Sequence, residues 1–520
     1  MSSKVNEALF DLISSMSKSE KRYFKLMSSR HTIGEENNYV RIFDHLDKHT
    51  GYDEELLFEK FKGEAFLNRF SITKKRLYDH VLSALDSFHS SNSIEAQIHK
   101  MLHSADILFE RSLYDQSRRI LRSAEKLALK YEKSALMIEI SAKQKRILET
   151  GGYVNISGTD LVELSDNEDF FIDQMREYNR IWSVKSQLFT QLAKKGVARS
   201  VEESKNYTEL CSTLLDNYNP KNITTEGKYL YNHTLSAYYY AIADLKKSLE
   251  YLKLNLGLFN ETSKELTIEP NKQISVLTNA IYISDKIGEY RTAIVYLNQL
   301  KSLAHNTESN EDLEIKLFSS VSSIELSMNL RKGAFNKASK IAIDIEQKLL
   351  GFGGKITSTR RAFLEFKIAV AYIGVGEFNT ALKWVNKILN DSELDKTEDI
   401  IGFTQLLDLL IHIELNHNKL LPYSLKSTQR FFKTRNRMYS FEKVFLQFIG
   451  RLLKCKDHFE MEKEWEDLYN DLVAITNDDV FESVALDYFD FQSWAESKLK
   501  GKSFDTVVRE KYNRTIRAAS

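Results

Sequence analysis

Proline and glycine are scarce in this sequence. Its 520 residues include 3 prolines, Pro220, Pro270 and Pro422, and 19 glycines. Because proline removes a backbone donor and kinks helix interiors, a chain with so few of these residues can be helical over most of its length. Between the breakers, hydrophobic residues recur at three- and four-residue spacing, which is the period of an α-helix. We therefore predict an all-α fold.

The sequence also lacks net charge, paired cysteines and long apolar runs. It carries 73 basic and 73 acidic side chains, so no overall charge draws the chain toward nucleic acid or a membrane. Its two cysteines, Cys211 and Cys455, lie far apart, which argues against a disulfide scaffold or a cysteine-rich zinc site. No apolar run of membrane-spanning length occurs, and the first 20 residues indicate an amphipathic helix rather than a signal peptide. We expect a cytoplasmic protein that does not bind membranes.

The stretch "GFGGKITSTR" at residues 351–360 combines glycines, a lysine and hydroxyls, as phosphate-binding loops do. A Walker loop requires a glycine five places before its Gly-Lys pair, a hydroxyl residue directly after the lysine, and a preceding strand. Leu349 and Ile356 occupy those two positions, and the preceding segment has a helical pattern. We therefore predict only a connection, with one helix ending at Gly351 and the next capped by a hydroxyl residue at 357–358.

A short pattern recurs along the chain. Each copy begins with a small residue, places an aromatic two positions later and a second small residue three positions beyond it. The copies begin at Ser112, Gly288, Gly333 and Gly376, with a weaker one at Ala243. The four starts at positions 243, 288, 333 and 376 are spaced by 45, 45 and 43 residues. The pattern predicts two helices joined by a tight turn, with the aromatic filling the elbow and the second small residue letting the helices approach. Such pairs stack on one another to bury their apolar faces.

This pattern resembles the tetratricopeptide repeat. Gly376, Phe378 and Ala381 match the glycine, aromatic and alanine of that family, and Ala369 and Tyr372 match the small and aromatic positions of its first helix. The period of about 44 residues is longer than the roughly 34 of the family, and the family's closing proline is missing. The resemblance implies an α-solenoid, a right-handed superhelix of helix pairs that binds a partner, and it implies no catalytic residue.

The resemblance extends over residues 94–435. We divide the chain accordingly into three parts. They are an N-terminal helical module at 1–92, a tetratricopeptide-repeat-like (TPR-like) array at 93–437 and a C-terminal helical capping segment at 438–520. A serine-rich stretch at 87–93 marks the first boundary. Terminal units of a solenoid must cover its apolar end, and the last segment, with four expected helices, suits that role.

Individual helices can also be placed. We expect five in the N-terminal module, near residues 3–16, 19–30, 37–49, 53–61 and 72–88. A long helix is expected at 167–195, after a loop at 150–160. An acidic stretch at 457–490 and a basic stretch at 426–437 are expected to face each other across packed helices.

The first helix of each pair is expected to line the concave face of the array. Counting back from the elbows places aromatic rings, bases and hydroxyls there, a mixture that suits an extended peptide or a partner helix. The alternative is that several of these side chains pack in the core between repeats. The candidate partner-binding residues are His233, Tyr240, Tyr282, Lys286, Ser323, Arg331, Phe366 and Lys367.

Basic residues in the N-terminal module raise a second hypothesis. They are Lys18, Lys21, Arg22, Lys25, Arg30, Arg69, Lys74, Lys75 and Arg76. Helical modules with such residues can bind phosphates, although acidic residues interleave here. The alternative function is therefore a regulator with a nucleic-acid-binding first module and a peptide-sensing array, similar in layout to repeat-containing peptide-sensing regulators of bacteria.

No catalytic constellation is visible in the sequence. We find no nucleophile elbow, paired-carboxylate motif or dinucleotide fingerprint. Histidine pairs four residues apart, such as His45 and His49, lack an identifiable third metal ligand. We expect no enzymatic activity, no cofactor and no metal site. The predicted function is a non-enzymatic scaffold that binds a peptide or partner protein on the concave face.

Overall fold

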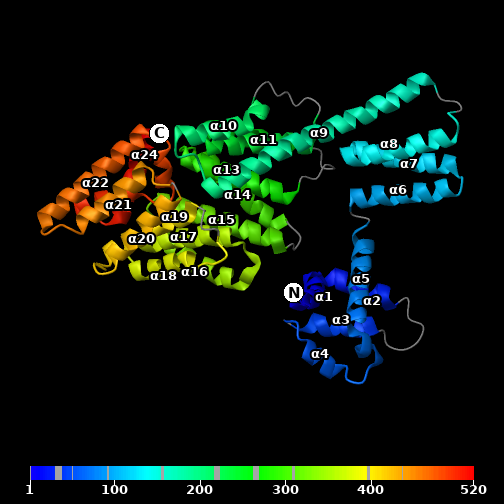
Figure 1. Ribbon diagram of the computed structural model, residues 1–520, viewed down its shortest axis with the longest axis horizontal. Coiled ribbons are helices and arrows are strands. Elements are labelled where there is room, and N and C mark those ends of the chain that lie inside the picture. The colour runs from blue at the N-terminus through cyan, green and yellow to red at the C-terminus, as the bar shows by residue number, and fades with distance from the viewer. Residues whose placement is uncertain are drawn as a thin grey trace. The chain divides into compact units, whose positions relative to one another are not determined.

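The computed structural model describes most of the chain. The described residues are 2–29, 38–49, 51–90, 93–153, 157–215, 223–261, 269–306, 311–394, 399–435 and 437–519. Every regular element within these stretches is a helix (Figure 1), so the predicted all-α class is confirmed. The chain forms two compact units, Met1–Ile172 and Asp173–Ser520. The boundaries expected near residues 92 and 437 stay predictions.

The first unit begins with a module of five α-helices and one short 3-10 helix. They are α1 (Ser2–Ser15), α2 (Lys18–Ser29), α3 (Asn38–Lys48), α4 (Glu54–Lys60), η1 (Ala65–Arg69) and α5 (Phe70–His89). Ile13, Phe24, Phe43, Leu57 and Leu77 form its buried core. The five predicted helices are confirmed, and η1 was missed because a single tight turn has no hydrophobic period.

The rest of the first unit is built from antiparallel helices. They are α6 (Ile94–Glu110), α7 (Tyr114–Lys130), α8 (Ser134–Thr150) and the first turns of α9 (Gly158–Lys195). Ile98, Leu121, Ala124 and Ile140 are buried between them, and Phe171 of α9 packs against this cluster. The predicted long helix is therefore confirmed, and it begins nine residues earlier than expected.

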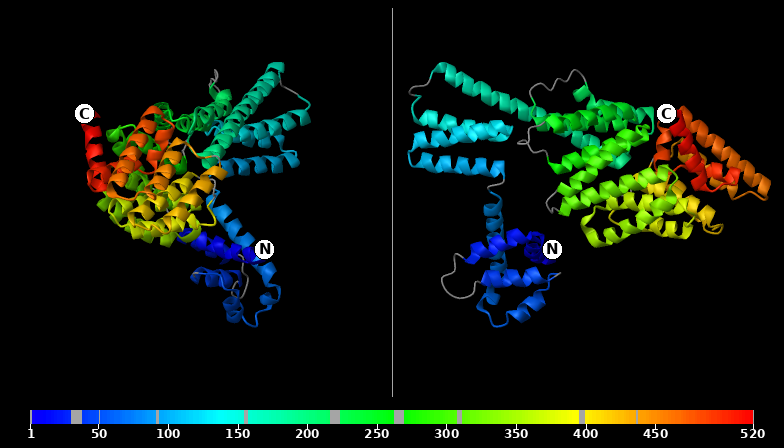
Figure 2. Two further views of the ribbon diagram at one scale, coloured as in Figure 1. Left: turned by 60° about the vertical axis from the view of Figure 1, so that its left-hand side comes forward. Right: turned by 180° about the vertical axis from the view of Figure 1, so that it is seen from behind.

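The second unit contains the remainder of α9 followed by successive helix pairs. The elements are α10 (Val201–Leu215), α11 (Thr225–Ala241), α12 (Leu245–Glu261), α13 (Pro270–Lys286), α14 (Tyr290–Asn306), α15 (Glu311–Arg331), α16 (Phe335–Phe352), η2 (Gly353–Lys355), α17 (Ser358–Gly374), α18 (Phe378–Leu389), α19 (Asp399–Glu414) and α20 (Leu421–Thr434). First helices lie side by side, with α15 between α13 and α17 and α17 beside α19 (Figure 2). This is the stacking of a TPR-like α-solenoid.

The elbows of these pairs share one backbone geometry. Ser112, Ala243, Gly288, Gly333 and Gly376 all have positive φ, between 61° and 87°. In each, the residue directly after the elbow donates its backbone N–H to the carbonyl of the residue four positions before the elbow. The N···O distances are 2.8 to 2.9 Å. This bond satisfies a carbonyl that the helix end would leave without a partner. The predicted turns are confirmed, and serine and alanine adopt the same left-handed conformation as glycine.

Helix α16 differs from the expectation at its end. It continues through Gly351 to Phe352, and the chain turns at Gly353, where φ is 56°. Thr357 is the N-cap residue of α17, and its side chain makes no capping hydrogen bond. The "GFGG" stretch therefore connects two helices, as predicted, but its turn lies two residues later.

The C-terminal segment folds as four helices, as predicted. They are α21 (Ser440–Leu452), α22 (His458–Asp478), α23 (Phe491–Lys500) and α24 (Phe504–Ala519), with η3 (Glu482–Asp487) between α22 and α23. Phe441, Phe445, Phe448, Phe491 and Trp494 are buried and continuous with the core of α15 to α20. The segment therefore shares the apolar interior of the array, as a solenoid cap must.

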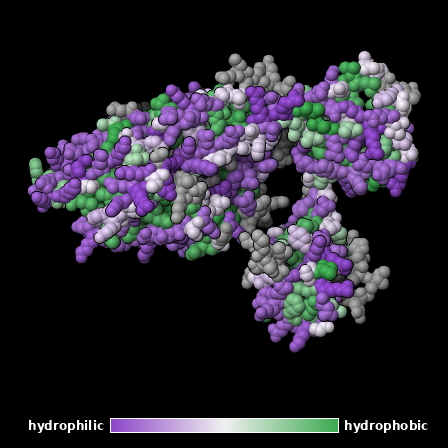
Figure 3. All heavy atoms as spheres, viewed as in Figure 1, coloured by the Kyte–Doolittle hydropathy of each residue, from purple (hydrophilic) through white to green (hydrophobic). Residues whose placement is uncertain are grey.

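The outer surface is mainly polar. Figure 3 shows a face on which hydrophilic residues predominate and hydrophobic ones form small separate patches. Within the described stretches, no helix combines the length and apolarity needed to cross a membrane.

Candidate binding site on the inner helices

The eight predicted partner-binding residues all lie on first helices. His233 and Tyr240 belong to α11, and Tyr282 and Lys286 to α13. The remaining four are Ser323 and Arg331 on α15 and Phe366 and Lys367 on α17. The structure brings four of them, Tyr240, Tyr282, Lys286 and Phe366, into one row of contacts around residues 487–488, whereas His233 lines a separate pocket. Their role in partner binding stays a prediction.

The row of contacts is covered by a segment of the same chain. Asp487, at the end of η3, forms an ion pair with Lys286. The next residue, Tyr488, stacks on Phe403 of α19 with ring centroids 3.8 Å apart, and meets the Phe366 ring edge-on at 6.0 Å. The Tyr240 and Tyr282 rings meet edge-on at 6.3 Å, and Asp487 acts electrostatically on both phenols. Residues 487–488 therefore pack against the first helices α11, α13, α17 and α19.

A buried ion triad holds this segment in place. Arg199, in the turn after α9, pairs with Glu442 of α21 at 3.1 Å and with Glu482 of η3 at 3.2 Å. All three side chains are at most 7% exposed. Glu482 also accepts the backbone N–H groups of Ser440 and Phe441 at 2.8 and 3.1 Å, where the N-terminus of α21 favours negative charge. Burial raises the pKa of Glu442, and Arg199 opposes that rise.

The acidic stretch at 457–490 therefore does not face the basic stretch at 426–437 in the way we expected. Glu482 and Asp487 bind Arg199 and Lys286, whereas Arg437 pairs with Asp399. The reason is that η3 turns back onto the inner helices, a path that local charge pattern does not encode.

Three further predicted residues are engaged within the array. Arg331 pairs with buried Asp285 at 2.9 Å. Lys367 donates to the hydroxyl of Ser323 at 2.7 Å. Burial, together with the nearby Arg331 charge, lowers the pKa of Lys367 to about 8. This part of the inner face is therefore filled with internal partners.

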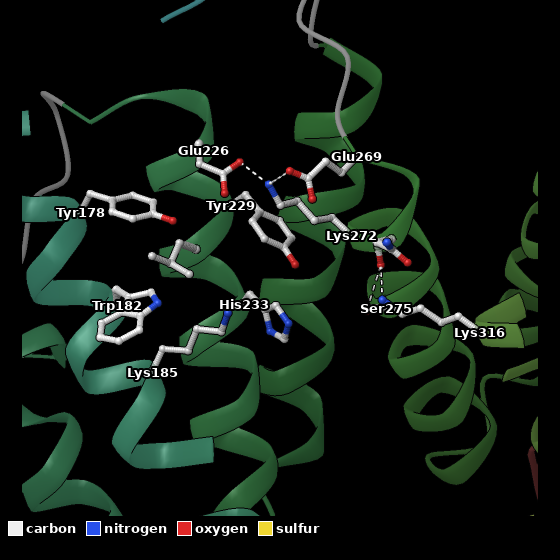
Figure 4. Close-up of a pocket in the computed structure, with 12 residues that line it drawn as sticks. Tyr178, Trp182, Lys185, Glu226, Tyr229, His233, Glu269, Lys272, Ser275 and Lys316 are labelled. Atoms are coloured by element: carbon white, nitrogen blue, oxygen red, sulfur yellow. Dashed lines mark hydrogen bonds and ion pairs between the residues drawn. The ribbon is translucent and has the colours of Figure 1, made fainter. Parts of the chain in front are cut away.

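An open pocket of about 400 Å³ lies farther toward the N-terminal end of the second unit (Figure 4). Helix α9 contributes Tyr178, Trp182 and Lys185 to it. These positions are spaced by four and three residues, so they share one face of the helix. The other walls come from α11, α13 and α15. The volume lies within the range of pockets that hold small ligands or peptide side chains.

Aromatic rings form one wall of the pocket. Trp182 is 51% exposed although it lines a concavity, whereas Tyr229 of α11 is 6% exposed. The His233 ring meets Tyr229 edge-on at 5.5 Å and Phe189 at 5.4 Å. Burial lowers the pKa of His233 to about 4, so this ring is neutral at pH 7. The wall offers flat, uncharged surface to a bound group.

Charged side chains also line the pocket. Lys272 of α13 pairs with Glu226 at 2.6 Å and with Glu269 at 3.5 Å, as Figure 4 shows. Lys185 of α9 and Lys316 of α15 lie on opposite sides of the pocket in Figure 4, and neither has a carboxylate within ion-pair distance among the described residues. Lys316 donates to the Asn271 carbonyl at 3.1 Å. Burial lowers the pKa of both Lys185 and Lys316, because a charged ammonium is costly away from water.

Sequence reasoning identified His233 alone among the pocket residues. Trp182, Lys185 and Lys316 lie on α9 and α15, helices separated by more than a hundred residues. The shared face of Tyr178, Trp182 and Lys185 on the long helix was the one signal available, because a polar helix rarely needs such a stripe.

Among the described residues of the N-terminal module, three of the basic side chains named above form ion pairs. Lys21 pairs with Asp47 and Lys25 with Asp44, both at 2.7 Å. Lys74 pairs with Glu54 at 3.1 Å. Arg30 lies outside the described residues. Each of these pairs reduces the positive charge available to a nucleic-acid backbone.

Two histidines of the N-terminal module lie close together. The His45 and His49 rings lie 4.5 Å apart, and Lys60 approaches the Nδ1 of His45 at 3.3 Å. In the described part of the chain, no group of three or more His, Cys, Asp or Glu side chains is arranged to hold a metal ion.

Comparisons with known proteins give structural likenesses. No protein-family model and no curated protein matches the chain. The apo form of the quorum sensor NprR from B. thuringiensis is similar over 76% of this chain and 98% of its own, with 13% identity and a TM-score of 0.42. A Rap protein complexed with competence and sporulation factor is similar over 80% of this chain and 99% of its own, with 10% identity and a TM-score of 0.40. The repeat assignment rests on the elbows and helix pairs described above.

Proposed function

We propose that this protein is a non-enzymatic scaffold that binds a peptide, or a short segment of a partner protein, in the pocket between α9, α11, α13 and α15. The observation that carries the proposal is the exposure of Trp182 inside a concavity. Covering a half-exposed indole contributes more binding free energy than covering almost any other side chain.

The position of the pocket supports this assignment. Asp487 and Tyr488 pack against the first helices α11, α13, α17 and α19, so a partner at those contacts would have to displace them. Among the described residues, the pocket needs no such displacement. Its walls are packed helices, and a preformed wall lowers the ordering cost of binding.

The chemistry of the pocket favours binding over catalysis. The Ser275 hydroxyl donates to the Asn271 carbonyl of its own helix at 3.0 Å. His233 contacts aromatic rings and is too weakly basic at pH 7 to act as an efficient general base. A nucleophile and an activating base are therefore not brought together by these two residues.

Selection of peptides by the full-length chain tests the proposal. Random peptides displayed on their own messenger RNA would be selected on the wild-type protein and then measured against Trp182→Ala. We expect affinity to fall by about 30-fold, as for a hot-spot aromatic. Tyr423→Ala is the matched control, because Tyr423 is 77% exposed on α20 and lies away from the pocket. Failure to enrich any peptide, or equal binding by Trp182→Ala, would contradict the proposal.

A further inference from the structure

Helix α20 presents a row of exposed cations. Lys426, Arg430 and Lys433 are exposed, and their spacing of four and three residues places them on one side of the helix. The other side carries Leu425 and Phe432, which are buried in the core. Helix α20 contains no acidic residue, and none of the three cations has a carboxylate within ion-pair distance among the described residues. We call these three cations the basic face of α20.

Helix α22 presents a row of opposite charge. It carries seven acidic residues and one lysine. Glu462 and Glu466 are exposed, and they share one side of the helix with Phe459, which is 78% exposed. Trp465 and Leu468 are buried in the core. Neither exposed glutamate has a cation within ion-pair distance in the described part of the chain. We call Phe459, Glu462 and Glu466 the acidic face of α22.

The two faces have matching spacing when the helices run antiparallel. Lys426 then lies opposite Glu466. Arg430, four residues later, lies opposite Glu462, four residues earlier. Three residues farther along, the last cation of α20 lies opposite Phe459. This alignment forms two ion pairs, places an ammonium group on an exposed ring and sets the helix dipoles in a favourable antiparallel arrangement.

The two faces do not pair with each other within one chain. Helices α20 and α22 both pack on α21, which lies between them (Figure 1). Among the described residues, no ion pair joins α20 to α22. A second copy of the chain offers each face the charge that it lacks, and such complementarity selects one partner over others.

We propose that the protein self-associates through the basic face of α20 on one copy and the acidic face of α22 on the next. Each copy carries both faces, so two copies can exchange them reciprocally, and the contact then occurs twice. None of the residues of either face lines the pocket of the proposed function. Failure of the peptide selection therefore leaves this inference unaffected, and the reverse also holds.

Sedimentation of the full chain over a range of concentrations measures the association. One variant reverses the charge of α20, Lys426→Glu/Arg430→Glu, and another reverses that of α22, Glu462→Lys/Glu466→Lys. In each variant like charges face each other, so we expect the dissociation constant of self-association to rise by at least about a hundredfold. Higher ionic strength should also weaken the wild-type association, because salt screens exposed charges.

A mixture of the two reversed variants gives the sharpest test. The reversed α20 of one variant faces the reversed α22 of the other, and their unaltered helices face each other as well. We expect the mixture to associate as tightly as the wild type although neither variant associates alone, and this recovery shows that both are folded. Lys337→Glu/Lys340→Glu is the matched control, because it makes the same change in charge at two exposed lysines of α16. It should associate like the wild type.

Three results would overturn the inference. They are a wild-type chain that sediments as a single copy at every concentration, a reversed variant that associates like the wild type, and a mixture that stays dissociated. The basic face has a different partner if the wild type stays single and binds a labelled DNA duplex that the α20 variant does not bind. That result would assign the face to nucleic acid and would also contradict self-association.

Discussion

Tyr488 stacks on Phe403 with ring centroids 3.8 Å apart and ring planes 13° from parallel. The two residues are separated by 85 positions in the sequence, and their contact brings the C-terminal segment onto the first helices of the array. The first helices of this solenoid are therefore partly buried in a core that the repeats share with the segment that follows them.

The stacking should contribute measurably to stability. Tyr488→Ala removes a ring that contacts both Phe403 and Phe366, and we expect the free energy of unfolding of the second unit to fall by about 2–4 kcal/mol. Urea unfolding followed by circular dichroism measures the change. Tyr423 is exposed, so Tyr423→Ala should leave the free energy of unfolding within about 0.5 kcal/mol of the wild-type value. Equal losses of unfolding free energy in the two variants would contradict a stabilising role of the Tyr488 contact.

The ion triad should respond to loss of its cation and to pH. Arg199→Met leaves Glu442 and Glu482 buried together, so we expect a loss of about 3–5 kcal/mol at pH 7. Without the guanidinium, the already raised pKa of Glu442 rises further. Protonation then removes one buried charge, so the deficit should shrink as pH falls from 7 toward 5.

A second variant separates charge from packing at the triad. Arg199→Met/Glu442→Gln removes one of the two uncompensated carboxylates, and its deficit at pH 7 should be smaller than that of Arg199→Met alone. If both variants unfold at the same urea concentration at every pH, the triad acts through shape and not through charge.

Two elbow glycines should differ although both have positive φ. A Cβ at Gly333 would lie 2.8 Å from the backbone nitrogen of Arg509 in α24, whereas a Cβ at Gly288 would meet nothing within 4 Å. Gly288→Ala should cost about 1 kcal/mol through its backbone conformation alone. Gly333→Ala should cost about 1–3 kcal/mol more, together with faster hydrogen exchange in α24. Equal costs would show that α24 does not pack on this elbow.

His233 should make the protein sensitive to mild acid. Its pKa of about 4 in the folded state lies below the ordinary 6.5, so the unfolded chain binds the proton more tightly. Stability is therefore fully present above pH 6.5 and is lost as pH falls toward 4, by about 3 kcal/mol from this residue. His233→Gln should flatten the dependence of the unfolding free energy on pH in that window. A wild-type slope retained by the variant would rule out His233 as its origin.

The nucleic-acid alternative yields a direct test. Because Lys21, Lys25 and Lys74 are paired with acids, we expect the full chain to show no DNA binding that weakens steeply with salt. Fluorescence anisotropy of a labelled duplex at low and moderate ionic strength measures this. Salt-dependent binding that is lost in Lys75→Ala/Arg76→Ala would instead favour the regulator.

The elbows show how far sequence reasoning reaches. Gly288, Gly333 and Gly376 were recognised by a pattern of small and aromatic residues, and each has the backbone conformation and hydrogen bond that the pattern requires. Ala243 follows the same rule without being glycine. Local patterns encode these features because every atom in the turn belongs to residues close together in the chain.

The candidate site shows what could not be predicted from the sequence. Trp182 and Lys316 line one pocket from two helices whose proximity no local sequence pattern predicts. Lys286 was predicted to face a partner, and its observed partner is Asp487 of the same chain, 201 residues away.

The sequence by itself determined that the chain is helical and where the helices of its repeated pairs turn. Helical period and turn geometry are local, so composition and spacing specify them. Only the tertiary structure decided that Asp487 and Tyr488 pack on the first helices and that α9, α11, α13 and α15 together form a pocket. Those outcomes depend on how stacked helices bring distant side chains together. The local sequence around a side chain does not specify which residues of other helices it contacts.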